Sequence, residues 1–470
     1  MKRYLTVVSL LLLCGIQSIK ANVVLPAIFG NGMVLQQKEN VKVWGKAKLN
    51  ANVLITTSWN NKTYTVKTNA SGNWKTTIAT PTAGGPYSIT FNDGNKITLS
   101  DILIGEVWLC SGQSNMEMPI KGFGNQPILN SNDILLDAEE PGVRLFRIEK
   151  NMSRTPVADV TNKWEHANAV TVKEFSAIGY QFARMLQQKL KVPVGIIQSA
   201  YGGTDIEAWM TKNSLTGFTD FKTPADSAKV IKNDPAVLFN AMIIPIIGYN
   251  IKGVLWYQGE NNRMNPLTYA QKMAAMVKEW RTQWATNQWP FYYVQIAPNV
   301  YNDHKEEIPL LYEAQAQAMT LIPNSGMVVS VDAGSQTTIH PPNKTIISKR
   351  LAYWALAKTY GKEGIAYMGP VYKSLKITDD KVILSFDQIP TGLTAFDQKL
   401  KSFEIAGEDK VFYPADAAIS GKTVVVKSES VKKPVAVRYA FKDNAVGNLY
   451  NVEGLPSAPF RTDNWDNTKP

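Results

Sequence analysis

"WLCSGQSNMEMP", residues 108–119, is the stretch of sequence that decides the fold. It closes an apolar run, ILIGEVWLC, which begins at residue 102 and gives way abruptly to serines, a glycine and amides. Such a run is typical of a strand buried on both faces, and Ser, Gly and Asn are typical of the turn that follows. Ligands of open α/β sheets bind outside the carboxyl ends of the strands. The stretch therefore predicts a core strand that carries polar side chains to a binding site.

After this strand, short apolar runs alternate with amphipathic helical patterns. Four more strands are expected at VGIIQSA (194–200), IKGVLWYQ (251–258), FYYVQIA (291–297) and GMVVSVD (326–332). Apolar residues that recur every three or four positions predict helices between them. The expected helices cover residues 172–190, 268–285, 311–322 and 343–361. This alternation predicts a three-layer α/β/α domain with a parallel sheet over residues 101–362.

The flanking segments, residues 22–100 and 363–470, have the shorter pattern of antiparallel sheets. Alternating stretches such as VKVWG (41–45) and KVILSF (381–386) are separated by turn signals such as NDGN (92–95). We therefore expect an N-terminal β domain, the central α/β domain and a C-terminal β domain.

The first residues have the pattern of a targeting segment. Lys2 and Arg3 precede an apolar run over residues 5–16. This pattern predicts a secretory signal peptide over residues 1–21, and hence export to the periplasm, the cell surface or the medium. The run is short for a membrane span and no later run is apolar enough, so membrane insertion is not expected.

The net charge and the numbers of cysteines and histidines argue against several kinds of binding site. The formal net charge is +11, but the lysines are scattered singly, so a solvated basic surface is favoured over a nucleic-acid site. Without the signal peptide the chain keeps one cysteine, Cys110, which excludes an intrachain disulfide and a thiolate metal site. The three histidines are far apart in the sequence. We therefore expect no metal, no cofactor and no nucleic-acid partner.

The polar residues that follow the strands are those that acyl transfer requires. Ser114 is the candidate nucleophile, and a hydroxyl needs a neighbouring base to attack an ester. His340 lies between the fifth strand and a helix, which favours it as that base. The other histidines, His166 and His304, lie in polar loops and are interpreted as turn residues. Ser111 is the weaker candidate nucleophile because it falls nearer the strand.

Structural interpretations of the same residues stay open at this point. Ser114 also suits the cap of a helix, and Gly202 and Gly203 also suit an ordinary turn. The functional interpretation is that glycine N–H groups and the amides of residues 258–261 bind a developing oxyanion, a task that needs closely placed donors.

Four sequence blocks resemble those of a known family. They are GEVWLCSGQSNMEMP (105–119), GGTDIEAW (202–209), WYQGENN (256–262) and IHPPNK (339–344). Together they resemble the SGNH-hydrolase superfamily, and in particular its sialate O-acetylesterase branch. Stretches near both ends of the chain are similar to that branch too, so the resemblance covers nearly the whole sequence. It implies an SGNH-type fold and a serine carbohydrate esterase that uses no cofactor.

The resemblance also assigns roles to individual positions. It implies that Ser114 is the nucleophile and that His340 is the general base. It implies an oxyanion hole built from the N–H of Ser114, the N–H of Gly203 (or of Gly202) and a side-chain amide of Gln258 or Asn261, with Gln258 favoured.

One position departs from the family pattern. The superfamily that the sequence resembles usually carries an aspartate three residues before the histidine, and here that residue is Thr337. No carboxylate lies between Asp332 and His340. Three arrangements stay open: Asp332 completes a triad, a more distant acid does so, or a backbone carbonyl orients His340 in a Ser-His dyad.

The resemblance implies O-acetylated sialic acid as the substrate, and the basic composition suits its carboxylate. Arg263, directly after the third block, is the candidate for binding that group. An esterase of the same mechanism that acts on acetylated xylan or another polysaccharide is the nearest alternative. A catalytically silent carbohydrate-binding protein is the alternative of a different class, and Thr337 is the reason for considering it.

Overall fold

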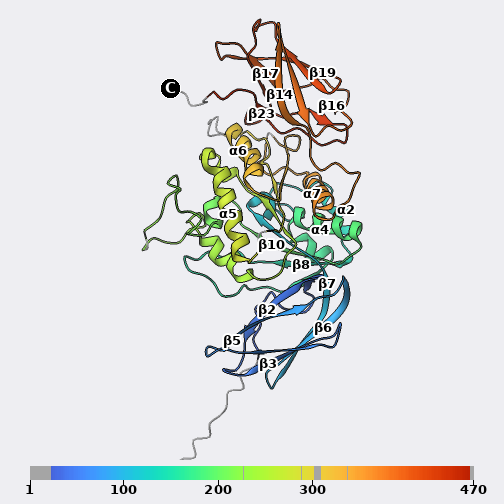
Figure 1. The fold of residues 1–470 in the computed structure, drawn as a ribbon, viewed down its shortest axis with the longest axis vertical. Helices are drawn as coiled ribbons and strands as arrows, with labels where there is room; N and C mark the ends of the chain where they lie inside the picture. The colour runs from blue at the N-terminus through green and yellow to red at the C-terminus, as the bar shows by residue number, and fades with distance from the viewer. Residues whose placement is uncertain (1–22, 226, 287, 301–307, 336, 466–470) are drawn as a thin grey trace, which may run out of the picture.

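The structure is a computed structural model that describes residues 23–225, 227–286, 288–300, 308–335 and 337–465. The predicted signal peptide and His304 lie outside the described residues. Three regions are stacked along the longest axis: N-terminal β-strands, a central α/β region and C-terminal β-strands (Figure 1). The fold class predicted from the sequence is confirmed.

The central sheet is built around β7 (Lys96–Gly112). This strand pairs in parallel with β10 (Val194–Ala200) on one side and with β11 (Gly253–Tyr257) on the other. The sheet runs in the order β13–β12–β11–β7–β10–β8–β9, and along this path the edge pair β8–β9 is antiparallel. Its outer strands are β8 (Glu140–Arg147), β9 (Trp164–Ala167), β12 (Phe291–Val294) and β13 (Ser325–Val328). The loops that follow β7, β10 and β11 therefore meet at one edge.

The burial of β7 accounts for its continuous apolar sequence. Successive side chains of a strand point to opposite faces of the sheet. Val107 and Leu109 belong to the hydrophobic core on one face, and Trp108 and Cys110 to the core on the other. All four side chains are fully buried. A strand covered on both faces needs apolar residues at every position, as the sequence has here.

Helices cover both faces of the sheet. On one face α4 (Ala177–Leu190) packs against α7 (Lys344–Trp354), and on the other α5 (Tyr269–Gln283) packs against α6 (Ile308–Leu321). The short helices are α1 (Ser114–Glu117), α2 (Ser131–Leu136), α3 (Ala169–Lys173), η1 (Ile206–Trp209), η2 (Phe239–Ile243), η3 (Ile244–Ile246), η4 (Glu260–Asn262), η5 (Pro266–Thr268) and η6 (Ala355–Thr359). Among the described residues, no helix combines the length and the apolar character that a membrane span requires.

The helix predicted over residues 172–190 is interrupted at Ser176. The Oγ of Ser176 accepts a hydrogen bond from the N–H of Gly179 at 3.0 Å, so it caps α4. The same hydroxyl donates to the carbonyl of Met116 in α1 at 2.6 Å. The cap therefore starts a new helix and ties α4 to the short helix that follows β7.

The predicted boundary between residues 100 and 101 falls inside β7. The first half of β7 pairs with β6, and the second half pairs with β10 and β11, so one strand enters both regions without a linker. At the junction Asp101 has a φ of 54°, a left-handed conformation that aspartate tolerates. Its carboxylate contacts His166 at 2.9 Å, which gives that histidine a structural role. The other N-terminal strands are β1 (Val34–Gln36), β2 (Asn40–Lys46), β3 (Asn52–Thr57), β4 (Thr63–Lys67), β5 (Asn73–Ala79) and β6 (Gly84–Asn92).

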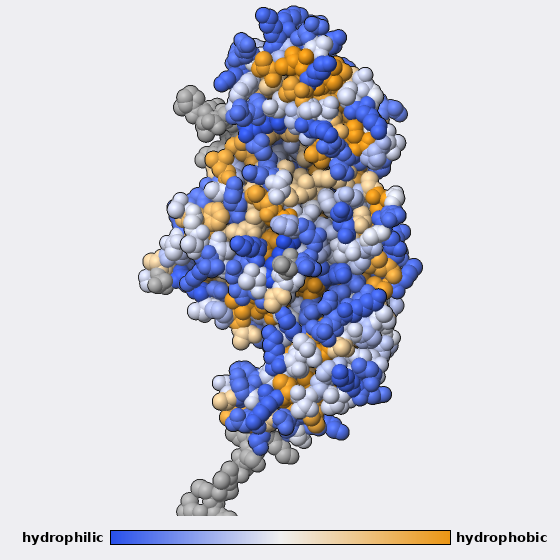
Figure 2. Space-filling model, viewed as in Figure 1, coloured by the Kyte–Doolittle hydropathy of each residue, from blue (hydrophilic) through white to orange (hydrophobic). Residues whose placement is uncertain are grey.

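The C-terminal β region has a core of its own and packs on the loop after β13. Val331 of that loop belongs to the C-terminal core, and Arg461 pairs with Glu313 of α6 at 2.8 Å. On the face shown in Figure 2, hydrophilic residues cover most of all three regions, and smaller apolar patches lie among them in each region. Its strands are β14 (Val371–Thr378), β15 (Lys381–Asp387), β16 (Leu393–Thr394), β17 (Phe403–Ala406), β18 (Phe412–Pro414), β19 (Asp416–Ser420), β20 (Thr423–Lys427), β21 (Ala436–Tyr439), β22 (Tyr450–Asn451) and β23 (Phe460–Arg461).

Candidate active site

Ser114 and His340 meet at the carboxyl edge of the central sheet. β7 ends at Gly112, whose φ is 133° and whose Cα is so close to Tyr257 that an added Cβ would lie 2.2 Å from its carbonyl oxygen. This tight approach turns the chain, and Ser114 becomes the first residue of α1. The Oγ of Ser114 lies 2.7 Å from the Nε2 of His340, although 226 positions separate the two residues.

The other ring nitrogen of His340 faces the side chain of Gln126. Nδ1 is in hydrogen-bond contact with Gln126 Oε1, so the ring donates from Nδ1 and keeps the Nε2 lone pair for the hydroxyl of Ser114. The ring of Phe123 packs edge-on against the imidazole, with centroids 5.3 Å apart. Burial, with a smaller effect of the nearby positive Lys344, lowers the pKa of His340 to about 4. The imidazole is therefore neutral at pH 7, which is the state that a general base needs.

Gln126 was not among the residues predicted from the sequence. Its loop is a tight turn in which Phe123 and Gln126 exchange two backbone hydrogen bonds of 3.1 Å. Gly124 and Asn125 occupy the turn, and Asn125 has a φ of 60°. The Gly-Asn pair signals a turn in the sequence, but nothing local shows that the turn places an amide beside a histidine 214 positions away.

Asp332 does not orient His340, so this part of the sequence prediction is corrected. Its two carboxylate oxygens accept hydrogen bonds from the guanidinium of Arg350 at 2.7 and 2.6 Å, and one of them also faces the hydroxyl of Tyr450 at 3.3 Å. Asp332 thus forms a bidentate ion pair that joins α7 to the C-terminal region. The group at Nδ1 of His340 is a neutral amide and not a carboxylate.

The loop after β10 passes directly beside Ser114. A Cβ added to Gly202 would lie 3.1 Å from the Cβ of Ser114, so only glycine fits there without displacement. The N–H of Gly202 is engaged, because it donates to Glu117 at 2.6 Å. In the described chain, the N–H groups of Ser114 and Gly203 donate to no protein acceptor. Of the two glycines, Gly203 is therefore the one whose amide is available to a substrate.

Lys232 lies on the other side of this loop. Its Nζ donates to the carbonyl of Gly202 at 2.6 Å, and it would come within 2.7 Å of a Cβ at Gly203, whose φ is 67°. Both Lys232 and Lys150 lie over the ring of Tyr201, at 5.6 and 5.1 Å from its centroid. The glycine loop therefore carries nearby positive charge.

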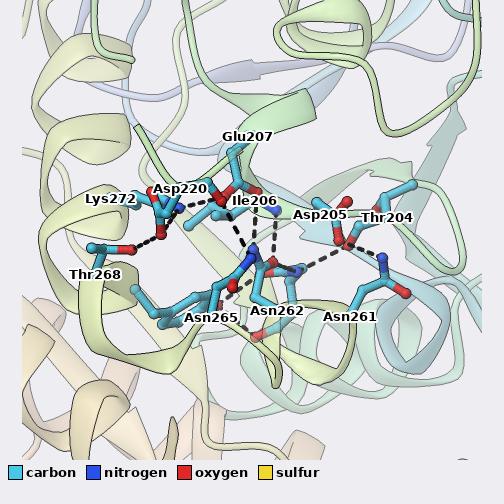
Figure 3. A network of polar contacts seen from close by, with 12 residues as sticks. Thr204, Asp205, Ile206, Glu207, Asp220, Asn261, Asn262, Asn265, Thr268 and Lys272 are labelled. Atoms are coloured by element: carbon cyan, nitrogen blue, oxygen red, sulfur yellow. Dashed lines mark hydrogen bonds and ion pairs between the residues drawn. The ribbon is translucent and has the colours of Figure 1, made fainter. Parts of the chain in front are cut away.

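The structure corrects the expectation that Gln258 supplies an oxyanion donor. Gln258 is fully buried, and its amide hydrogens go to the carbonyl of Thr204 at 2.9 Å and to Asn262 Oδ1 at 2.6 Å. Asn261 donates to the carboxylate of Asp205 (Figure 3). Both amides therefore brace the loop around Gly203, and the two hydrogens of the Gln258 amide are already engaged there.

A second network, which the sequence did not reveal, surrounds Asn115. Its amide donates to the carbonyl of Ile339, next to His340, at 3.0 Å, and to Glu260 at 2.5 Å. Its oxygen accepts from the buried ammonium of Lys344. Burial lowers the pKa of Lys344 to about 7 and raises the pKa of Glu260 above its usual range. Asn115, the residue after Ser114, is thus hydrogen-bonded to Ile339, the residue before His340.

The remaining candidates take other positions. Arg263 follows η4 and donates to the carbonyl of Glu260 at 3.0 Å. Ser111 is fully buried within β7, out of reach of a substrate. Cys110 is a free, buried thiol whose pKa is raised by burial. Within the described residues, no group of three or more His, Cys, Asp or Glu side chains is arranged to hold a metal ion.

A serine hydroxyl hydrogen-bonded to an imidazole at the carboxyl end of the central strand, within a three-layer α/β/α fold, is the arrangement of the SGNH-type hydrolase class. Comparison with known families agrees and is more specific. Residues 104–353 match the family described as carbohydrate esterase, sialic acid-specific acetylesterase, and the chain belongs to that family. The protein is thus a carboxylic ester hydrolase.

Individual relatives extend the similarity beyond that segment. The chain is 27% identical to the rat sialate O-acetylesterase over 92% of both chains, and 29% identical to the human sialate O-acetylesterase over 76% of this chain and 74% of that one. A crystal structure of a carbohydrate acetylesterase from Xanthomonas citri matches with a TM-score of 0.86 and 35% identity, covering 94% of this chain and 100% of that chain. The flanking β regions are therefore shared with that esterase.

Proposed function

We propose that the protein removes O-acetyl groups from sialic acids, with Ser114 as nucleophile and His340 as general base. The observation that carries the proposal is the 2.7 Å contact between Ser114 Oγ and His340 Nε2. Family membership and the named sialate O-acetylesterases among the relatives support the substrate class. The targeting pattern of residues 1–21 supports export, so we propose that the enzyme acts outside the cytoplasm.

In the first step, Ser114 Oγ attacks the acetyl carbonyl carbon while His340 Nε2 takes the hydroxyl proton. The carbonyl oxygen becomes an oxyanion, and the N–H groups of Ser114 and Gly203 donate to it. The charge of Lys232 behind the glycine loop favours the same anion. His340 then gives its proton to the sugar oxygen as the ester C–O bond breaks, which leaves an acetylated Ser114 and the free sugar hydroxyl.

In the second step, water replaces the sugar. His340 Nε2 removes a proton from the water, whose oxygen attacks the acetyl carbon, and the same two N–H groups again stabilise the oxyanion. His340 returns that proton to Ser114 Oγ as the bond between Oγ and the acetyl carbon breaks, and the acetic acid that leaves loses its remaining proton to solvent and becomes acetate. The imidazole is neutral at the start of each step, in agreement with its pKa of about 4.

Gln126 takes the position at which a triad has its acid. Its oxygen can fix the ring and the tautomer with Nδ1 protonated, but it brings no negative charge to stabilise the imidazolium. Removing the acid from a Ser-His-Asp triad lowers the rate by roughly 10⁴-fold, in part through the wrong tautomer. We therefore assign orientation, and not charge, to Gln126.

The test is acetate release from O-acetylated sialic acid by the wild type and by Ser114→Ala. The expected result is measurable turnover that falls by at least about 1,000-fold in the variant. Hydrolysis of p-nitrophenyl acetate provides a second reading of the same chemistry. Equal, near-background rates of both proteins on both substrates would instead support the silent carbohydrate-binding protein.

A second candidate function is deacetylation of a neutral polysaccharide such as acetylated xylan. The Xanthomonas citri relative is a carbohydrate acetylesterase, a description that covers this activity as well as the first. The values of kcat/KM on O-acetylated sialic acid and on acetylated xylan separate the two. A value at least tenfold higher on the sialic acid supports the first proposal, and the reverse order supports the second.

A further inference from the structure

A cavity of about 810 Å³, lined by polar and apolar groups, lies beside the glycine loop of the active site. Its described lining residues come from the segment that follows Gly203, between residues 205 and 234, and from residues 261–265. Its volume is within the range of cavities that hold small organic ligands. Neither Ser114 nor His340 lines it, so it is a separate compartment from the catalytic pair.

The cavity is nevertheless connected to the catalytic loop. Asp205, a lining residue, is only two positions after Gly203, so it lies within roughly 8 Å of that residue along the chain. Its N–H donates to Asn233 at 3.2 Å, and its carboxylate accepts from Asn261, and both partners also line the cavity. A sugar chain whose acetyl group reaches Ser114 would therefore extend a neighbouring residue into this space.

The walls are rich in hydrogen-bond acceptors. Asp205, Asp220 and Asp234 supply carboxylates, and the aromatic ring of Phe221 supplies an apolar surface. Asparagine side chains complete the polar lining at positions 233, 261, 262 and 265. Hydroxyl groups donate well to carboxylates, and sugar rings pack on aromatic faces. Among the described lining residues four carboxylates, Glu207 included, stand against one lysine, Lys222, and three of the four are paired with Lys272 or Arg154. The lining therefore offers a sugar carboxylate no net positive charge. This chemistry suits an uncharged, hydroxyl-rich sugar.

A buried ion network fixes the part of the wall that contains Glu207 and Asp220 (Figure 3). Lys272, which is 0% exposed, donates to Glu207 at 2.6 Å and to Asp220 at 2.7 Å. Asn262 donates to the second oxygen of Glu207 at 2.9 Å. The acceptors on this wall are therefore fixed before a ligand arrives, which lowers the entropy cost of binding.

We infer that this cavity binds an uncharged sugar residue next to the acetylated one. The inference rests on the proposed esterase function and adds a specificity: the enzyme prefers an acetylated sugar that carries a neutral neighbour. For a sialic acid substrate, the cavity takes the neutral part of the glycan while the sialic acid carboxylate lies elsewhere.

The experiment compares kcat/KM for matched pairs of substrates: O-acetylated sialyllactose against free O-acetylated sialic acid, and O-acetylated xylotetraose against O-acetylated xylose. In the wild type, the ratio of oligosaccharide to monosaccharide is expected to be at least tenfold for the pair that the enzyme cleaves. Phe221→Ala is expected to lower that ratio to near 1, because the stacking surface is lost.

Lys229→Ala is the matched control, because Lys229 is an exposed residue of the same loop that does not line the cavity. It should keep the wild-type ratio. A wild-type ratio near 1, a ratio that Phe221→Ala leaves unchanged, or cleavage of neither oligosaccharide overturns the sugar site. The esterase proposal is tested separately by p-nitrophenyl acetate hydrolysis. If the wild type and Ser114→Ala hydrolyse it at equal rates, the esterase proposal fails, whatever the substrate ratios are.

Discussion

At the scale of single residues, the environment of His340 sets the pH range of activity. Its pKa is lowered from 6.5 to about 4, mainly by burial. A protonated ring has lost the Nε2 lone pair, so the base is inactive below that pKa and active above it. We expect kcat/KM to rise with pH through about 4 and to be level by about pH 5. A pH profile of p-nitrophenyl acetate hydrolysis checks this, and an acid limb near 6.5 would contradict it.

Gln126 is the residue whose replacement tests the histidine's orientation. Gln126→Ala removes the acceptor at Nδ1, so the ring is free to rotate and to adopt the other tautomer. We expect kcat to fall by about 100-fold with little change in KM, since general-base catalysis contributes roughly 100- to 10,000-fold. Gln126→Glu puts a carboxylate at the same place, and we expect it to keep the activity that Gln126→Ala loses. Because the negative charge stabilises the protonated imidazole, the acid limb of the pH profile should move above pH 4.

Thr337→Asp is the control for that prediction, because it restores the acid that the family pattern has at this position. Thr337 is exposed and forms hydrogen bonds with Ser335, while Gln126 already occupies Nδ1 of His340. We expect no gain in kcat from Thr337→Asp alone. A gain of tenfold or more would show that the orienting position is the family one and that Gln126 is dispensable.

The residue-level predictions that succeeded and failed have a common explanation. Ser114 and His340 could be placed together because Ser114 follows β7 directly and His340 lies in the connection from β13 to α7, at the carboxyl edge of the same parallel sheet. Gln126 could not, because its loop is positioned by tertiary contacts. The role of Gln258 was assigned from its residue type, but two acceptors opposite its amide occupy both hydrogens.

At the scale of elements, the start of α7 links catalysis to stability. It carries Lys344, whose buried ammonium holds Asn115 and lies in the field of Glu260. Lys344→Met leaves the buried Glu260 with Arg263 as its remaining positive neighbour and Asn115 without its lysine donor, and removing one partner of a buried charge interaction costs about 3 kcal/mol. We expect that loss in chemical denaturation, and an upward shift of the His340 acid limb, since a positive neighbour is removed.

The double variant Lys344→Met with Glu260→Gln removes both charges. If the charge pairing is the cause, the double variant recovers most of the lost stability. If it is as unstable as Lys344→Met alone, packing and not charge explains the loss.

Element identity was predictable where the apolar pattern was long, as in β7 and α5, but the breaks were not. Ser176 stops one predicted helix because its hydroxyl finds Gly179 and Met116 as partners, and Met116 is 60 positions away. Likewise β7 extends across the predicted domain boundary, since Asp101 adopts a left-handed conformation without ending the strand.

At the scale of the whole molecule, Asp332 holds the C-terminal region on the catalytic one. The Asp332–Arg350 pair is mostly buried, with the side chains 10% and 5% exposed, and Tyr450 joins it from the C-terminal strands. We expect Asp332→Asn to lower the free energy of unfolding by about 3 kcal/mol while kcat changes by less than twofold. Calorimetry and steady-state kinetics check both parts. A 1,000-fold loss of kcat in a folded Asp332→Asn protein would contradict this structural role and would show that Asp332 acts as the acid of a catalytic triad.

The order of three regions along the chain was predictable from strand and helix patterns, and the structure has β-rich regions before and after the central α/β region. The way they dock was not readable, because Val331, Asp332 and Tyr450 carry no local signal that they face each other. The acidic cavity was also hidden, since its carboxylates are spread over residues 205–234 within a chain whose overall charge is +11.

The central claim is that His340 activates Ser114, and covalent trapping tests it most directly. A serine-reactive fluorophosphonate is added to the wild type and to His340→Ala, and the modified peptide is identified by mass spectrometry. The account predicts labelling of Ser114 in the wild type and a rate at least about 100-fold lower in the variant. Labelling of another residue, or equal labelling of Ser114 in both proteins, would contradict it.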